Sequence, residues 1–461
     1  MKRILPLCAL VLLVAATPRM SERDRAQHAL DRLAFGARPG DVDRVLAMGV
    51  DRWIEQQLHP ERLSDRAVEA RLAKYETLSW SDDEAMKKIA VPLLEARRKA
   101  NSGAARQPAG TPAPGRRERP KMPREQRPQR IVAELSAQRI LRAAESERQL
   151  NEVMVDFWMN HFNVFAGKNI DRFLVASYER DTIRPRIWGH FEDLLMATAK
   201  APAMLVYLDN ARSRSGAINE NYAREIMELH TLGVDGGYSQ ADVTELARVF
   251  TGWSITRPNS GTMDFVFRNG LHDRGTKRVL GVTLAQGGMG EGERMIRFLA
   301  HQPATAHHIA AKLCQRLVAD EPSPALVDRV AKRFLDSNGD LRATVKAVLD
   351  DPEFWNPRNL RAKTKSPFEY AISAVRAAAA TIEDPLPLAR ELKNIGEPLY
   401  LAQPPTGYSD KAETWSNNGA LVARLNFATA LAGNKMPGIR VTTSDPQALA
   451  RQLGGPEFQR Q

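Results

Sequence analysis

Apolar residues recur at intervals of three and four along almost the whole chain, and this spacing restricts the fold more than any other sequence feature. Between Glu22 and Phe35 they occupy positions 26, 29, 30, 33 and 34, and Gly36 follows where a helix commonly ends. The same pattern predicts further helices over 42–48, 52–58, 64–78, 83–98, 131–145, 148–160, 171–199, 219–232, 240–250, 291–300, 304–319, 324–336, 341–350, 367–381 and 417–432.

One segment breaks this helical pattern. Met263–Arg268 alternates like a strand, and Asn269-Gly270 after it is a common hairpin turn. We therefore expect an all-α fold of many helices with one small β-hairpin near 263–282. The chain has 461 residues, 43% of them apolar, which excludes a collagenous or wholly disordered protein. Its two cysteines exclude a disulfide framework and a zinc module built on four cysteines.

The first 16 residues are typical of a secretory signal peptide. Lys2 and Arg3 precede an apolar run over 4–16, and Val14-Ala15-Ala16 places small residues where a signal peptidase cleaves. The run is too short to span a membrane, which takes about 20 residues. We therefore expect a periplasmic or secreted product that is not an integral membrane protein. Cleavage would remove Cys8 and leave Cys314, which we expect to be buried and inert.

The net charge of +11 is concentrated in one segment. Eleven Lys and Arg residues lie between Arg97 and Arg130 against two Glu residues, together with six prolines. Such a composition predicts a disordered insertion over 99–130, between helical parts of one domain at 21–98 and 131–435, with a C-terminal tail at 436–461. The insertion either attracts polyanions or is a solvated linker. It has no aromatic residue on which bases could stack, so we predict no specific nucleic-acid site.

The 219–232 segment is the most informative for function. At 100° per residue, Arg224, Glu225 and Glu228 share a polar face, whereas His230 falls in the middle of the apolar face. Two interpretations remain open. The segment is either a surface helix with ion pairs such as Arg224–Glu228 and a core histidine, or one wall of a buried polar site.

Other polar residues occur where they could join such a site. His161 lies among aromatic residues near a helix end, and His272-Asp273 follows the expected hairpin turn on a loop. Lys363 and Lys365 precede a strong helix start at Ser366, where the helix dipole is already positive. Positive charge there needs a protein carboxylate or a bound anion to offset it.

Several runs of the chain resemble a bacterial secreted family known as domain of unknown function 1800 (DUF1800). These runs are HALDRLAFG at 28–36, WIEQQLHP at 53–60, NENYAREIMELHTLG at 219–233, GGY at 236–238 and ARVFTGW at 247–253. Shorter matching segments continue as far as the run at 363–369. PTGY at 405–408 also fits, although Tyr408 stands where tryptophan is expected. The resemblance implies an exported, mainly helical protein, often encoded beside an exported sulfatase-like protein, and it assigns no catalytic residue.

Two classes of function follow from these observations. The first is a periplasmic metal-assisted hydrolase acting on envelope or extracellular material. It would use Glu225 as general base, Arg224 as anion clamp and a divalent zinc, manganese or iron ion. The predicted metal ligands are His161, Glu228, His230, His272 and Asp273, which we expect to converge in one cavity near Glu225. The alternative is a non-catalytic scaffold, assembly or export partner whose polar residues form a structural network.

Overall fold

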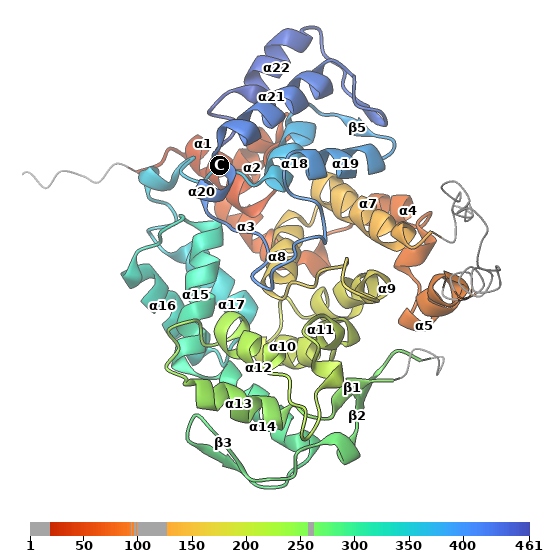
Figure 1. Cartoon of the computed structure of the whole chain (residues 1–461). Helices are drawn as coiled ribbons and strands as arrows, with labels where there is room; N and C mark the ends of the chain where they lie inside the picture. The colour runs from red at the N-terminus through yellow and green to blue at the C-terminus, as the bar shows by residue number, and fades with distance from the viewer. Residues whose placement is uncertain (1–18, 94, 96–97, 99–126, 257–261) are drawn as a thin grey trace, which may run out of the picture.

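The computed structural model describes residues 19–93, 95, 98, 127–256 and 262–461, and within them it is mainly helical (Figure 1). The first helices are α1 (Glu22–Leu33), α2 (Asp41–Met48), α3 (Val50–Leu58), α4 (Arg66–Leu72) and α5 (Asp82–Ala85). The middle of the chain forms α7 (Gln129–Glu145), α8 (Gln149–His161), α9 (Asp171–Ser177), α10 (Phe191–Lys200), α11 (Pro202–Tyr207), α12 (Asn221–Glu225) and α13 (Gln240–Val249). The last helices are α14 (Met289–Ala300), α15 (Pro303–Leu317), α16 (Pro324–Asp336), α17 (Leu341–Asp350), α18 (Pro367–Ala377), α19 (Leu386–Asn394), α20 (Ala412–Trp415), α21 (Asn418–Ala432) and α22 (Pro446–Gly454).

Local capping explains where several helices begin. At α18, the Ser366 hydroxyl accepts from the backbone N–H of Glu369, and the Glu369 carboxylate accepts from the N–H of Ser366. This capping box satisfies two of the donors that every helix start leaves free. Ser323 and Pro324 start α16 in a related way, since the Ser323 side chain accepts from Leu326 and proline occupies the first helical position.

Several of the predicted helices are interrupted, and two of them bear on the site. The 171–199 segment divides into α9, a π-helical turn η5 (Tyr178–Ile183) and α10. The 219–232 segment is shorter than expected and consists of α12 followed by a π-helical turn η7 (Ile226–His230). A π-turn rotates the following side chains relative to an ideal helix. A projection at 100° per residue therefore does not give the direction of the His230 side chain.

The strands form three separate two-stranded antiparallel sheets, which confirms a mainly helical fold with small hairpins. The strand expected at 263–268 is β2 (Phe265–Phe267), and it pairs with the preceding β1 (Trp253–Ile255). Asn269-Gly270 therefore does not connect paired strands but begins a short 3-10 turn. The next hairpin joins β3 (Lys277–Val279) to β4 (Val282–Leu284), and β5 (Thr381–Ile382) pairs with β6 (Ile439–Arg440).

Residues 436–461, which we expected as a tail, carry β6 and α22. Helix α22 packs along α21, and both lie at one end of the molecule with α18 and α19 (Figure 1). Beyond α22, the backbones of Lys363 and Gln461 exchange two hydrogen bonds of 3.1 and 2.8 Å. Lys365 N–H donates to the carbonyl oxygen of Gln459 at 2.9 Å. This segment is therefore an integral wall of the fold.

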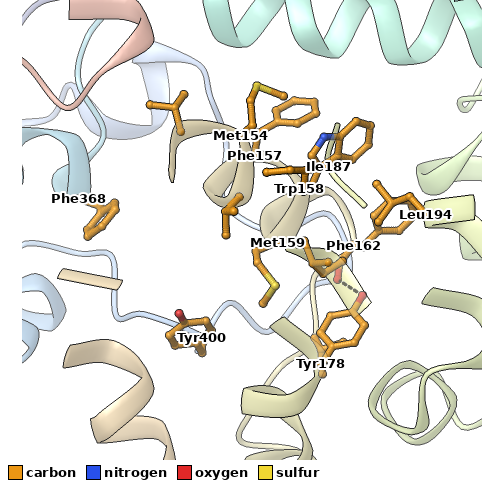
Figure 2. Packing of buried hydrophobic residues seen from close by; sticks show 14 of the residues in the cluster. Met154, Phe157, Trp158, Met159, Phe162, Tyr178, Ile187, Leu194, Phe368 and Tyr400 are labelled. Carbon is orange, nitrogen blue, oxygen red and sulfur yellow. Dashed lines mark hydrogen bonds between the residues drawn. The ribbon is translucent and has the colours of Figure 1, made fainter. Parts of the chain in front are cut away.

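Buried apolar side chains from α1 to α22 form one continuous core. Figure 2 shows part of it around α8, where Met154, Phe157 and Trp158 are packed and the Tyr178 hydroxyl donates to the carbonyl oxygen of Phe162 at 2.9 Å. Residues on both sides of the basic segment contribute to this core, so they pack as one unit. Among the described residues, no helix is both long and apolar enough to cross a bilayer.

Two sequence expectations fall on residues that the structure does not describe. The predicted signal peptide at 1–16 lies outside the described residues, as does 99–126 of the predicted insertion. The last two residues assigned to that insertion, Gln129 and Arg130, belong to α7.

Candidate functional site

Three histidines from three elements come together at the end of η7. His161 ends α8, His230 ends η7 and His308 lies in α15, and the His161 ring centroid is 6.1 Å from that of His230 and 6.2 Å from that of His308. The Nε2 atoms of His161 and His308 lie 3.2 and 3.1 Å from the backbone carbonyl oxygens of His230 and Leu229. A carbonyl oxygen only accepts, so both imidazoles donate through Nε2 and cap the last carbonyls of the turn.

These three rings are held neutral. Burial lowers the pKa of His161 well below its ordinary value, with the neighbouring His230 and His308 acting in the same direction. Burial also lowers the pKa of His230 to about 3 and that of His308 to about 4. Gly233 contributes to the close packing, because a Cβ at this position (φ +85°) would lie 3.0 Å from Nδ1 of His308. We refer to His161, His230 and His308 as the histidine trio.

The acidic residues of the same segment form a second group. The Tyr238 hydroxyl hydrogen-bonds Glu228, and the pKa of Glu225 is raised by burial and by the nearby Glu228. Arg224 does not pair with Glu228 as the i,i+4 spacing predicts. Its Nη2 lies 3.2 Å from Glu220 at the surface. The anion clamp proposed for Arg224 thus already holds a carboxylate of its own helix.

His272 and Asp273 belong to a third group, beside β3. The Nδ1 atom of His272 lies 2.8 Å from the Thr251 carbonyl oxygen, and its Nε2 lies 3.3 Å from Nζ of Lys277. The ring therefore donates through Nδ1, and its Nε2 also lies 3.4 Å from the Glu291 carboxylate. Lys277 also forms a buried ion pair of 2.7 Å with Glu291.

Asp273 is bound to Arg248 by two hydrogen bonds of 3.1 Å from Nε and Nη2. This pairing holds the pKa of Asp273 below its usual value. A planar guanidinium matches both oxygens of a carboxylate, so such a contact fixes the Asp273 side chain in place.

The predicted five-ligand metal site is therefore divided. The structure brings His161 together with His230, but no hydrogen bond, ion pair or ring contact among the described residues joins them to His272 or Asp273. The described part of the chain contains no group of three or more His, Cys, Asp or Glu side chains arranged to hold a metal ion. His272 follows β2, which pairs with β1, and its ring contacts Thr251, Lys277 and Glu291.

A larger charged network, which sequence reasoning missed, crosses the interior. Arg316 of α15 is 8% exposed and contacts Asp156 at 3.0 Å, Glu369 at 2.9 Å and Asp410 at 3.1 Å. Burial alone would lower the pKa of Arg316, but the three carboxylates raise it. They come from α8, α18 and the loop before α20, so one guanidinium ties together segments far apart in the sequence.

The two lysines before α18 differ in their surroundings. Lys363 pairs with Asp320, so a protein carboxylate offsets its charge, which is one of the two alternatives left open by the sequence. Lys365 is 4% exposed, and its ammonium group has no hydrogen bond or ion pair with any described residue. Its Nζ lies 4.0 Å from the centre of the Phe458 ring. Burial lowers the pKa of Lys365 to about 8, although Asp31 and Glu369 act in the opposite direction.

Lys365 lines a pocket of about 650 Å³ between α1, the loop before α2, α18 and the segment that follows α22. We call it the Lys365 pocket. Its other charged residues are Asp31, Arg38, Arg361, Arg451, Glu457 and Arg460. Arg361 pairs with Glu457 at 3.6 Å, and Asp31 acts on Lys365 as the opposite charge, so two acidic residues face five cationic ones. An excess of positive charge remains in this pocket.

The family of proteins of unknown function designated DUF1800 matches residues 28–461 of this chain. The chain belongs to the DUF1800 family. Searches of curated proteins and of solved structures found no match. The resemblance seen in the sequence motifs is thus confirmed over nearly the whole chain.

The DUF1800 match includes every wall of the Lys365 pocket, from α1 to the residues after α22. It also includes the histidine trio, whose His230 lies in the longest motif. Sequence reasoning placed His161 and His230 in the site but not His308. Adjacent helix residues point about 100° apart, and accordingly His308 faces the trio whereas the side chain of His307 is 58% exposed.

Proposed function

We propose that this DUF1800 protein is an exported, non-catalytic binding protein that holds an anionic group in the Lys365 pocket. The observation that carries the proposal is the buried Lys365 ammonium, which lacks a hydrogen-bonding or ionic partner among the described residues while it lines a cavity. A largely buried charge is unfavourable unless opposite charges lie near it, and Asp31 and Glu369 offset this cost for Lys365 only in part, since its pKa is still lowered. Proteins retain such a group where a ligand completes its interactions.

The non-catalytic alternative is favoured over metal-assisted hydrolysis by the surroundings of the candidate groups. Asp273, one of the predicted metal ligands, is already held by Arg248. The Nε2 atom of His272 faces Lys277 and Glu291. Among the described residues, no three candidate ligands come together to hold a metal ion. Buried polar groups with such partners act to specify one packed structure. The polar residues of the DUF1800 motifs are, in this proposal, structural.

The charge and size of the pocket indicate its ligand. Arg451 and Arg460 are exposed, lie at the pocket and have no side-chain partner among the described residues. A volume of about 650 Å³ suits a small molecule or one end of a larger one, since ligand pockets span roughly 300–1,000 Å³. We therefore propose a carboxylate, sulfate or phosphate group on envelope or extracellular material, or on the co-encoded sulfatase-like partner that the family resemblance implies.

Calorimetric titration of the purified protein with phosphate, sulfate and citrate tests this proposal. We expect saturable binding of at least one anion. In Lys365→Met the affinity should be weaker by about tenfold or more, because the ion pair between the anion and the Lys365 ammonium is lost. Lys393→Met is the matched control, because Lys393 is exposed and has no partner among the described residues. No binding by the unaltered protein, or equal binding by Lys365→Met, would contradict the proposal.

Export is a separate part of the proposal and rests on residues 1–16 alone. Removal of about 16 residues is expected from a signal sequence of this form. Amino-terminal sequencing of the protein recovered from the periplasm or medium tests it. A retained Met1 on protein found only in the cytosol would contradict it.

A further inference from the structure

A second cavity, of about 730 Å³, lies away from the Lys365 pocket. Its walls come from the π-helical turn η3 (Met86–Ala90), α9, the end of α11 and the β1–β2 hairpin. In Figure 1, α9, α11 and β1 are neighbours on the side of the molecule nearest α5. The Lys365 pocket lies at the opposite end, where α1, α18 and α22 gather. We call the second cavity the arginine cavity.

Four arginines give the cavity its charge. They are Arg172, Arg212, Arg214 and Arg268. Arg212 and Arg214 are exposed and form no hydrogen bond or ion pair through their side chains with any described residue. The Nε atom of Arg172 is buried without a partner. Arg268 is held in place by a 2.9 Å hydrogen bond from Nη2 to the Ile255 carbonyl oxygen.

Among the described residues that line the cavity, one side chain is acidic, and it already pairs with a lysine. Asp209 lines the cavity and pairs with Lys168 at 2.7 Å. The four guanidinium groups are therefore not offset from within the described walls. Arginines of this kind bind carboxylates and phosphates through two parallel hydrogen bonds.

The remaining walls of the arginine cavity are mostly apolar. Apolar side chains that line it include Leu93, Ile170, Phe173, Val206, Ile255 and Leu271. Leu271 is 39% exposed at the rim, whereas Phe173 is buried at 5%. An inorganic anion would form no apolar contacts with these walls, and a neutral apolar molecule would form no ion pairs with the arginines.

We infer that the arginine cavity binds an amphiphilic anion, with the arginines on a phosphate or carboxylate head and the apolar walls around a short chain or ring. The size agrees with such a ligand, because about 730 Å³ lies within the range of small-molecule sites. The inference is independent of the Lys365 pocket, since the two cavities share no lining residue.

Octyl phosphate, used below its micelle-forming concentration, is the probe, with inorganic phosphate and octanol as its two halves. The titrations use Lys365→Met, so that the anion site proposed in the Lys365 pocket does not contribute. In calorimetric titration of this variant we expect octyl phosphate to bind at one site, about tenfold or more tighter than either half. Arg212→Ala/Arg214→Ala should weaken this binding by about tenfold or more, because two charge-assisted contacts are lost. Both side chains are exposed, so the double variant should fold normally.

Arg52→Ala/Arg333→Ala is the matched control, because both arginines are exposed without partners in the described residues and neither lines the cavity. Made in the Lys365→Met background, this control should bind octyl phosphate as tightly as Lys365→Met alone. Equal binding by Arg212→Ala/Arg214→Ala would overturn the inference. So would equal affinity for octyl phosphate and inorganic phosphate, or no binding of octyl phosphate at all.

Discussion

His161 lies 69 residues before His230 in the chain, and its Nε2 atom is 3.2 Å from the His230 backbone carbonyl oxygen. The contact joins the end of α8 to the end of η7, and His308 caps the neighbouring Leu229 carbonyl at 3.1 Å. Two side chains thus satisfy carbonyl groups that the interrupted helix leaves without intrahelical partners. His161 and His308 therefore have a clear structural role, and their burial lowers the pKa of both rings.

The first prediction concerns the pH dependence of stability. Burial lowers the pKa of His308 to about 4, whereas an unfolded histidine titrates near 6.5. Between these values the unfolded chain binds more protons, so the free energy of unfolding falls as the pH drops below about 6.5. His308→Gln should remove about 1–2 kcal/mol of the difference in unfolding free energy between pH 7.5 and 5.0.

Urea denaturation at the two pH values measures this difference. The exposed neighbour provides the control, because His307→Gln should retain the pH dependence of the unaltered protein. An unchanged pH dependence in His308→Gln would show that its ring is not held neutral by the fold.

The second prediction concerns Arg316. Arg316→Met would leave Asp156, Glu369 and Asp410 facing one another without their shared cation. Breaking a buried ion pair in this way costs about 3–5 kcal/mol of unfolding free energy. Arg333→Met, at an exposed position without a partner in the described residues, should change it by less than about 0.5 kcal/mol. Equal midpoints of chemical denaturation for the two variants would contradict this prediction.

The third prediction separates a broken ion pair from a removed one. The side chains of Lys277 and Glu291 are 0% and 2% exposed, and their charged atoms lie 2.7 Å apart. Lys277→Met should lower the free energy of unfolding by about 3–5 kcal/mol because the buried Glu291 carboxylate loses its lysine partner and keeps only the Gly287 N–H and His272 beside it. Lys277→Met/Glu291→Gln should recover more than about 1 kcal/mol of that loss, as coupled positions do. Strict additivity of the two single substitutions in thermal denaturation would rule out the coupling.

The fourth prediction concerns the acidic residues after α12. Burial and the nearby Glu228 raise the pKa of Glu225, so its ionised form is less favourable in the folded protein than in the unfolded chain. Stability is therefore lost as the pH rises through the titration of Glu225. Glu225→Gln should raise the free energy of unfolding at pH 8 by less than about 1 kcal/mol, since the half-exposed group is screened by solvent.

Glu220→Gln should have the opposite sign, because Thr244, Gln240 and Arg224 hold the pKa of Glu220 below its usual value. Chemical denaturation at pH 8 compares the two variants. A loss of stability in Glu225→Gln would mean that its carboxylate has a cationic partner in solution.

The fifth prediction rests on the proposed function. The pKa of Lys365 is lowered to about 8, so the ammonium group carries its proton at pH 7 and has lost most of it at pH 9. Anion affinity of the Lys365 pocket should fall by about tenfold between these pH values. Titrations at pH 7 and 9, with an anion whose charge is constant over this range such as sulfate, provide the measurement. An affinity independent of pH would contradict a role for the Lys365 ammonium.

Helix positions followed from the sequence wherever capping and apolar spacing agreed. The spacing and the Ser-Pro starts placed α16 and α18 to within a few residues. The pattern did not identify α11 or α22, which are short and depend on packing against α9 and α21 rather than on their own periodicity. Local sequence signals did not predict the strand pairing. Asn269-Gly270 has the composition of a hairpin turn, but it follows β2, which pairs with the preceding strand β1.

The candidate site was predictable only in part, for a similar reason. His161 and His230 were both placed near a buried polar site from their apolar surroundings, and the structure brings them together. The separation of His272 depends on which strands pair, and the charge state of Lys365 depends on Phe458 and Asp31, which are distant in sequence. Contacts of this range leave no periodic signal in the chain.

The pairing of residues 363–365 with residues 459–461 also affects the order in which the Lys365 pocket can form. A ribosome adds about 5–20 residues per second, so Lys365 emerges several seconds before the segment that covers it. During that interval the pocket lacks the wall formed by the segment after α22, including the Phe458 ring beside the ammonium group. The Lys365 side chain of a growing chain is therefore exposed before the pocket exists. The pocket can bind an anion only after the residues beyond α22 have been synthesised and have paired with residues 363–365.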